Sequence, residues 1–289
     1  MKVSGFTFIR NGIKFDYPYI EAIKSILPIC DDFIVAVGNS DDETRASILN
    51  LDPKIKIIDT VWDDSLRDGG KVLAVETDKA FAAVSKESDW AFYIQGDEVV
   101  HEKYLPIIKQ AMLKHQNDSN VDGLLFDYLH FYGSYDYVGA AHNWYRKEIR
   151  VIRSSKDIYS YKDAQGFRKN DNQKLNVKPI KASMFHYGWV KEPSAMQGKQ
   201  ETFHKLWHSD NWMKENVVKS NEFDYSIIDA LYPFKGTHPK VMKDRINSKN
   251  WKFDFDITMN KFKIKDKIKD LIEKFTGKRL GEYKNYNEI

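Results

Sequence analysis

The stretch Trp90–Val100, WAFYIQGDEVV, changes from apolar to acidic within a few residues. Its first half is a short, continuous apolar run, which is typical of a strand buried on both faces of a sheet. The run then stops at Gln95, Gly96, Asp97 and Glu98. An acidic turn that caps the next helix is the common explanation of such a sequence, and a ligand-binding strand end is the other. The surrounding sequence has to decide between them.

Strands and helices alternate through the chain up to this stretch. Apolar runs predict strands at residues 3–9, 31–38, 54–59 and 90–95. Apolar residues at helical spacing predict helices between them, at residues 17–27, 40–51 and 69–84. This alternation predicts an α/β fold with a mainly parallel sheet that helices cover on both faces. Ligands of such sheets bind beyond the carboxyl ends of the strands, where the polar residues 39–42 and 95–98 lie.

The remainder of the chain is richer in aromatic residues. Strands are predicted at residues 122–137, 148–155 and 182–191, with a polar, loop-rich stretch at 161–179 and a helix at 199–216. We therefore divide the chain into residues 1–120, residues 121–198 as the second half of the same domain, and residues 199–289 as a C-terminal helical extension.

Composition excludes several classes of protein. The chain has 289 residues and a net charge of +3, which is not the signature of a nucleic-acid-binding protein. Its single cysteine, Cys30, excludes an intrachain disulfide framework and indicates the reducing cytoplasm. The N-terminus is too polar for a signal peptide, and no apolar stretch is long enough to span a bilayer. The sequence also lacks the phosphate-binding loop, the G-x-G-x-x-G fingerprint, the G-x-S-x-G elbow and the H-E-x-x-H zinc motif.

The order of the elements, with their polar strand ends, resembles the inverting family 2 glycosyltransferases, which have the GT-A fold. Members of that family carry an Asp-x-Asp-type metal motif at the strand end that here reads Gln95-Gly96-Asp97-Glu98. The resemblance, over roughly residues 1–190, implies that Asp97 binds Mn²⁺ or Mg²⁺ and that His186, in FHYGWVK, completes the metal site. Gln95 departs from the pattern, because the family has a carboxylate at that position.

The resemblance also assigns polar residues to a nucleotide-sugar donor. They lie at the ends of the first, second and fourth predicted strands or close to the start of the helix at 69–84. These residues are Arg10, Asn39, Asp41, Arg67, Lys71 and Gln95. Asp68 belongs to the same segment, RDGGK. A cation beside the diphosphate would stabilise the charge that the leaving group gains. For Arg67 and Lys71, a solvated helix start is an equally good explanation.

An inverting transfer needs a general base that takes the proton of the acceptor hydroxyl. The family places a carboxylate in a polar loop after the later strands of the sheet, and Asp163, in YKDAQGFR, matches that placement best. Asp127 and Asp136 are the alternatives, and an aspartate that only shapes a loop remains open for all three.

The segment 261–279, KFKIKDKIKDLIEKFTGKR, is a basic amphipathic sequence with 8 basic and 3 acidic residues. Its apolar residues share one helical face and are Ile264, Ile268, Leu271, Ile272 and Phe275. Such a helix suits an anionic membrane surface, and it equally suits docking on the catalytic domain with a solvated lysine face. The resemblance favours the membrane surface, since family members often use lipid-linked or envelope acceptors.

Together these features predict a cytoplasmic, peripheral-membrane glycosyltransferase of cell-surface polysaccharide synthesis. Residues 1–120 would bind the nucleotide-sugar donor, residues 121–198 a glycan or lipid-linked acceptor, and the sugar would be transferred with inversion. One alternative is a non-catalytic nucleotide- or sugar-binding protein, which Gln95 favours. A nucleotidyltransferase is the second, although residues 9–18 lack its glycine-rich, basic signature. A membrane-surface protein that acts only through the segment 261–279 is the third.

Overall fold

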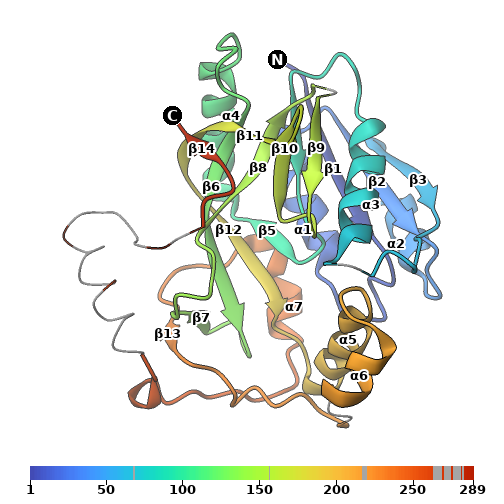
Figure 1. Ribbon diagram of the computed structural model, residues 1–289. Coiled ribbons are helices and arrows are strands. Elements are labelled where there is room, and N and C mark those ends of the chain that lie inside the picture. Colours follow the sequence, from blue (N-terminus) through green and yellow to red (C-terminus); the bar gives the residue numbers. More distant parts are fainter. Residues whose placement is uncertain are drawn as a thin grey trace.

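Four parallel strands form the centre of the sheet in the computed structural model, which describes residues 1–67, 69–155, 157–216, 220–262, 269, 275, 281 and 283–289 (Figure 1). The four are β1 (Val3–Ile9), β2 (Asp32–Gly38), β3 (Ile55–Thr60) and β4 (Trp90–Tyr93). They lie in the order β3-β2-β1-β4, so both neighbours of the central strand β1 run parallel to it. Their carboxyl ends therefore meet at one edge.

The second half of the chain extends the same sheet. Beside β4 lies the antiparallel β8 (Lys147–Arg153), then β6 (Gly123–Tyr132), then β12 (Asn176–Trp189), which runs parallel to β6. Short strands complete the edges: β5 (Glu98–Val100) and β14 (Asn287–Glu288) pair with β12, β7 (Tyr137–Gly139) with β6, and β13 (Leu231–Pro233) with β7. The described part of the sheet is thus mixed and crosses from one half of the chain into the other.

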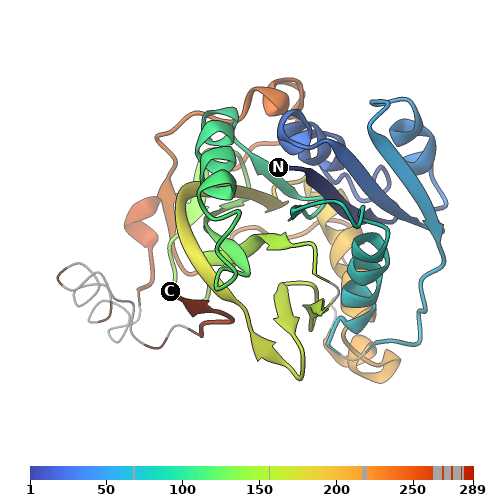
Figure 2. The ribbon, with the colours of Figure 1, turned by 90° about the horizontal axis from the view of Figure 1, so that it is seen from above.

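Helices cover both faces of the sheet (Figure 2). Along β2, Phe33 and Val35 pack into one apolar cluster and Ile34 and Ala36 into the other, because successive side chains of a strand point to opposite faces. The first cluster is covered by α1 (Tyr19–Ile26), α2 (Thr44–Leu49) and α4 (Leu105–Lys114). The second is covered by α3 (Lys71–Ala82) and a small sheet of β9 (Ile158–Tyr161), β10 (Gly166–Lys169) and β11 (Gln173–Lys174).

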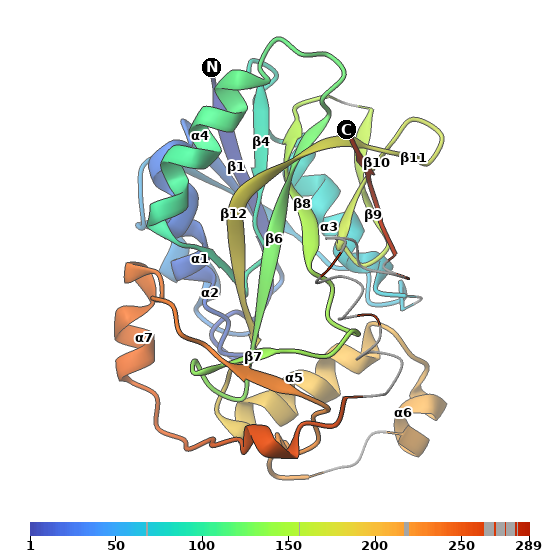
Figure 3. The same cartoon turned by 90° about the vertical axis from the view of Figure 1, so that its left-hand side faces the viewer.

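Residues 193–216 and 220–262 lie at the end of the molecule where the parallel strands have their carboxyl edge, whereas β14 pairs with the start of β12. Helices α5 (Pro193–Lys205) and α6 (Asp210–Asn216) sit below that edge in Figure 1, and α7 (Lys243–Asn247) lies below α1 in Figure 3. Short 3₁₀ turns occur at η1 (Leu27–Ile29), η2 (Glu102–Tyr104), η3 (Lys240–Met242) and η4 (Ile257–Met259). Helix α5 therefore borders the space at the carboxyl ends of the parallel strands.

The predicted α/β class, mainly parallel sheet and flanking helices are confirmed. Residues 98–100 form strand β5, which pairs with β12, so the alternative of an acidic turn that caps the next helix does not apply here. Two local predictions are wrong. The polar stretch 161–179 is mostly strand, since Phe167 and Leu175 are buried beneath it. In place of the single helix predicted at 199–216 there are two helices, Pro193–Lys205 and Asp210–Asn216.

The basic segment predicted at 261–279 lies largely outside the described residues, including Ile264, Ile268, Leu271 and Ile272. In the part of the chain that the structure describes, no helix is both long and apolar enough to cross a membrane.

Candidate functional site

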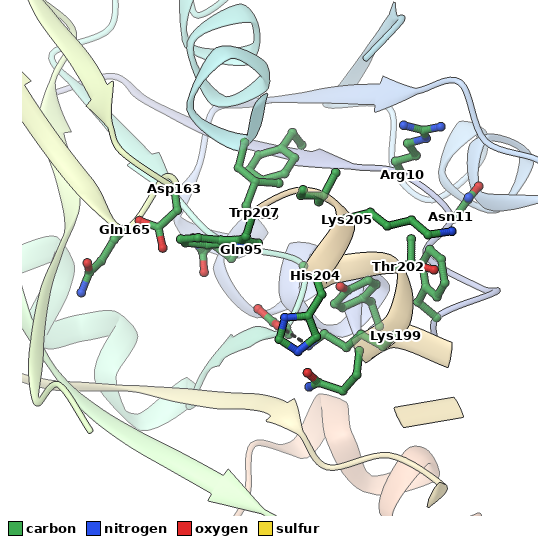
Figure 4. Close-up of a pocket in the computed structure, with 18 of the residues that line it drawn as sticks. Arg10, Asn11, Gln95, Asp163, Gln165, Lys199, Thr202, His204, Lys205 and Trp207 are labelled. Atoms are coloured by element: carbon green, nitrogen blue, oxygen red, sulfur yellow. Dashed lines mark hydrogen bonds and ion pairs between the residues drawn. The ribbon is translucent and has the colours of Figure 1, made fainter. Parts of the chain in front are cut away.

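A cavity of about 890 Å³ opens at the carboxyl ends of β1 and β4. The strand ends supply residues 8–11 and 95–97 to its wall, the turn between β9 and β10 supplies Asp163 and Gln165, and α5 supplies Lys199 and the residues after it. Figure 4 shows Asp163 and Gln95 together on one side, across the cavity from Arg10 and Asn11. The polar residues 95–97, which follow β4, are therefore part of the cavity wall.

Asp97 and His186 form a carboxylate–imidazole pair within this cavity. The Oδ2 atom of Asp97 lies 3.6 Å from Nε2 of His186, which β12 carries. A Cβ atom added to Gly188 would lie 2.6 Å from that oxygen and 2.7 Å from that nitrogen. Glycine at this position therefore leaves open the space that the carboxylate–imidazole pair occupies.

A chain of hydrogen bonds fixes the tautomer of His186. The backbone oxygen of Tyr145 can only accept, so Nε2 of His130, 2.8 Å away, must donate. Burial, and then His186, lower the pKa of His130 to about 3, so this ring is neutral near pH 7. Its Nδ1 therefore accepts from Nδ1–H of His186 over 3.2 Å. In neutral His186 the lone pair then resides on Nε2, the atom that faces Asp97.

Asp97 is held in its ionised form. Burial would raise the pKa of this carboxyl group, but His186 in its protonated form, Lys199 and Lys191 outweigh that effect and keep it below its usual range. The ammonium group of Lys199 lies 3.4 Å from Oδ2 of Asp97 and donates to the backbone oxygen of Gly188 over 2.8 Å. The cavity thus contains a negative charge with a positive one beside it.

Glu98, the next carboxylate, has a structural role. It is fully buried and accepts two hydrogen bonds from Arg150, at 2.8 and 2.7 Å, and a third from the hydroxyl of Tyr128. It also accepts from the backbone N–H of Gln95 over 3.1 Å, which closes the turn. Of the two carboxylates in QGDE, only Asp97 lines the cavity.

Gln95 connects this strand end to the turn that carries Asp163. Its Nε2 donates to the backbone oxygen of Ala164 over 3.0 Å and lies 3.3 Å from the hydroxyl oxygen of Tyr93. A carboxylate could not donate to that carbonyl, which gives a physical reason for glutamine here. Lys162 and Ala164, on either side of Asp163, have φ of 55° and 63°. Such strained backbone in a non-glycine turn is common where a side chain has to be aimed.

Asp163 and a second carboxyl group, Glu148, are both poor acids in this environment. Burial raises the pKa of Asp163, which makes its carboxylate a better proton acceptor. Burial also raises the pKa of Glu148 to about 8, so Glu148 is largely protonated near pH 7. Glu148 accepts a hydrogen bond of 2.8 Å from Gln165, which lines the cavity two residues after Asp163.

Of the six residues predicted to contact the donor, the structure brings Arg10, Arg67 and Gln95 to the cavity. Arg10 is paired with Asp64 over 2.7 Å and lies 5.4 Å from the ring of Trp62. Arg67 donates from Nε to the backbone oxygen of Lys205 over 2.6 Å. Both arginines are therefore held in place by contacts around the cavity.

The other three do not line the cavity. Asn39 accepts a hydrogen bond of 3.2 Å from the backbone of Trp62, and Lys71 is the exposed first residue of α3. Asp41 pairs with Lys14 over 2.5 Å at the surface. Asp68 lies outside the described residues. The two alternatives to Asp163 as base, Asp127 and Asp136, do not line the cavity either.

The carboxylate–imidazole pair has the donor atoms for a divalent cation, an ionised oxygen and a nitrogen lone pair. Among the described residues, no group of three or more His, Cys, Asp or Glu side chains could hold a metal ion. Asp97 and His186 therefore fit a cation that takes its other ligands from water and substrate phosphates, as Mg²⁺ usually does.

Sequence reasoning missed several side chains at this site. Lys199, His130 and Glu148 come from α5, β6 and β8, and their partners are far away in the chain. No local pattern marks them, because only the folded sheet, with α5 packed at its edge, brings them near Asp97 and Asp163.

Comparisons with known proteins identify no close relative. No family model and no curated protein matches the chain. Among solved structures, S. aureus TarS 1–349 in complex with UDP is 12% identical, with a TM-score of 0.40 over 76% of this chain and 68% of that one. For a longer TarS structure from S. aureus, the match spans 39% of that protein's chain.

Two further structures are similar at the same low level. Glucosyl-3-phosphoglycerate synthase from Mycobacterium tuberculosis, with Mn²⁺, UDP and phosphoglyceric acid, is 18% identical, with a TM-score of 0.30 over 45% of this chain and 43% of that one. The 4-diphosphocytidyl-2C-methyl-D-erythritol synthase from Anaerococcus prevotii is 11% identical, with a TM-score of 0.36 over 66% and 91%.

Proposed function

We propose that the chain is an inverting glycosyltransferase of the GT-A type that uses a nucleoside-diphosphate sugar. The observation that carries the proposal is the cavity at the carboxyl ends of β1 and β4, in which the ionised Asp97 and the proton acceptor Asp163 both lie. A site for transfer from a diphosphate donor needs cationic neutralisation of the leaving group and a base for the acceptor. The cavity has residue types suited to both tasks.

The donor's base and ribose would lie near Arg10 and Trp62. Trp62 lies close over Gly38, where a Cβ atom would be 2.4 Å from the indole nitrogen, and both Trp62 and Arg10 line the cavity. A flat aromatic ring and a guanidinium suit stacking on a nucleobase. The diphosphate would then extend toward Asp97 and His186.

Mn²⁺ or Mg²⁺ bound by Asp97 and His186 would neutralise charge on the departing nucleoside diphosphate. Asp163 would accept the proton of the acceptor hydroxyl. As that proton leaves, the hydroxyl oxygen forms a bond to the anomeric carbon, and the bond from this carbon to the diphosphate oxygen breaks. The nucleoside diphosphate leaves with the electron pair. One displacement of this kind inverts the anomeric centre.

The acceptor would bind against an aromatic part of the cavity wall. Trp144 and Trp189 both line the cavity, with ring centroids 6.2 Å apart and planes at 86°. Aromatic faces at right angles suit the apolar faces of a sugar ring, which supports a glycan as the acceptor. A lipid-linked acceptor and a role at the cell surface rest on the family resemblance, and contact with an anionic membrane rests on the segment 261–279; all three stay predictions.

Thermal unfolding against a panel of nucleotides tests the proposal. Purified protein would be melted with UDP, GDP, dTDP and their sugars, each with Mn²⁺ or with EDTA. Ligand at about 100 times its dissociation constant adds roughly 2.7 kcal/mol, which raises the melting temperature measurably. We expect one nucleoside diphosphate to raise it and the others not to. No shift with any nucleotide, with or without Mn²⁺, would refute the proposal.

A further inference from the structure

We infer that Lys199 binds the diphosphate of the donor and lets the site recognise this group without a divalent cation. The inference rests on the proposed function, because it assigns a ligand to the same cavity. It adds a cation that belongs to the protein and a binding role for α5, which the sequence did not predict.

The position of Lys199 is the first reason. Its side chain is 10% exposed and that of Asp97 is 14% exposed, yet both line the cavity. Figure 4 shows Lys199 extending from α5 into the space below Gln95 and Arg10. Its ammonium group is already placed by the backbone oxygen of Gly188 at 2.8 Å and by Asp97 at 3.4 Å. A phosphate that reached Asp97 would therefore meet an ammonium group that is already ordered.

The charges around Lys199 are the second reason. A second buried lysine, Lys191, lies on the same aromatic ring, and the two ammonium groups are 4.4 and 4.9 Å from the centroid of Tyr17. Lys191 donates to the backbone oxygen of Asp16, which is a neutral group. Both lysines are buried and lie within reach of the charge of Asp97. Burial lowers the pKa of both lysines, so an anionic ligand in the cavity would favour their charged forms.

The chemistry of the ligand follows from this arrangement. An ammonium ion forms charge-assisted hydrogen bonds with phosphate oxygens, and these are about twice as strong as neutral ones. A nucleoside without phosphates offers Lys199 only neutral acceptors, which bind an ammonium group more weakly. Lys199 should therefore distinguish nucleoside diphosphate from nucleoside, while Arg10 and Trp62 contact the part that both share.

Isothermal titration calorimetry in EDTA tests the inference. The ligands would be the nucleoside diphosphate found by thermal unfolding, its nucleoside, and inorganic pyrophosphate. Lys199→Met should weaken diphosphate binding by about 10- to 100-fold, the range expected for a hydrogen bond to a charged group, and leave nucleoside binding unchanged. Lys199→Arg should keep most of the affinity. Lys214→Met, on the exposed face of α6, is the matched control and should match the wild type.

The wild type also provides a readout that does not depend on the folding of a variant. Pyrophosphate should bind in EDTA and compete with the nucleoside diphosphate. The inference is overturned if pyrophosphate and the diphosphate bind wild type only with Mn²⁺, or if Lys199→Met binds the diphosphate as tightly as wild type. A wild type that binds no nucleotide with either EDTA or Mn²⁺ would instead refute the proposed function itself.

Discussion

Replacing Arg150 by leucine should destabilise the protein far more than removing a surface arginine with a similar ion pair. Arg150 makes two hydrogen bonds to Glu98, and both side chains are 0% exposed. Arg45 makes the same kind of bidentate pair with Asp59, at 2.6 and 3.0 Å, with side chains 49% and 62% exposed. The two arginines therefore differ in burial, and Arg150 also donates to the backbone oxygens of Ile149 and Gln165, which adds to the loss expected for Arg150→Leu.

The expected magnitudes follow from that difference. Without Arg150, the carboxylate of Glu98 stays buried with only Tyr128 and the backbone of Gln95 as donors. Breaking a buried ion pair on one side costs about 3–5 kcal/mol, whereas an exposed pair is worth about 0–1 kcal/mol. We expect Arg150→Leu to lose a few kcal/mol of unfolding free energy and Arg45→Leu to lose less than about 1 kcal/mol.

Urea unfolding of both variants, followed by circular dichroism, measures these free energies. A double variant, Glu98→Leu with Arg150→Met, removes both charges and should recover much of the loss. The reasoning fails if Arg150→Leu and Arg45→Leu lose similar amounts, or if the double variant is less stable than Arg150→Leu alone. Either result would mean that Glu98 does not depend on Arg150 and that its structural role is misassigned.

Asp163→Asn should lower turnover by about 10²- to 10⁴-fold and leave nucleotide binding intact, because a general base acts in the chemical step. Steady-state rates measure the turnover and calorimetry measures the nucleotide binding. Unchanged turnover would exclude Asp163 as the base. Glu148 ionises with a pKa of about 8 in the folded protein, as a result of burial, and near 4.5 when unfolded. Between pH 4.5 and about 8, unfolding therefore releases a proton from Glu148, so the free energy of unfolding should fall as pH rises through this window. Glu148→Gln should flatten this decline. If urea unfolding gave wild type and Glu148→Gln the same dependence of unfolding free energy on pH, the prediction would be contradicted. Gly188→Ala places a methyl group on the carboxylate–imidazole pair and should abolish Mn²⁺-dependent nucleotide binding, while Gly198→Ala, with open space around it on α5, should bind normally. If calorimetry gave both alanine variants the same Mn²⁺-dependent affinity for the nucleotide, the assignment of Asp97 and His186 as cation ligands would be refuted.

The sequence predicts the sheet well because its strands are buried on both faces. The predicted strand at residues 3–9 and the structural strand Val3–Ile9 coincide, since an uninterrupted apolar run has few other ways to be buried. The same reasoning fails for residues 98–100. Glu98 looks like a solvent-exposed turn residue in the sequence, and only its pairing with Arg150, which lies on β8, explains its complete burial.

The site was predictable in part, for a physical reason. Asp97, Gln95 and Arg10 lie at strand ends, and the rule that parallel strands bind ligands at their carboxyl edge brings them together. The same rule overreached for Asn39 and Asp41, because it gives the edge and not the direction of each side chain. Lys199 had no signal at all, since it is carried by a helix whose position depends on contacts with residues about a hundred positions earlier, such as Asp97.

Donor consumption tests the central claim most directly. Wild type and Asp163→Asn would be incubated with a panel of nucleotide sugars and simple glycan acceptors, with Mn²⁺ present. Release of nucleoside diphosphate would be measured, and the anomeric configuration of the product would be read by NMR. We predict that wild type releases the diphosphate from one donor, forms a product of inverted configuration, and outpaces Asp163→Asn by at least about 100-fold. Release of pyrophosphate would indicate nucleotidyl transfer, and nucleotide binding without consumption of any donor would indicate a binding protein; either result would contradict the account.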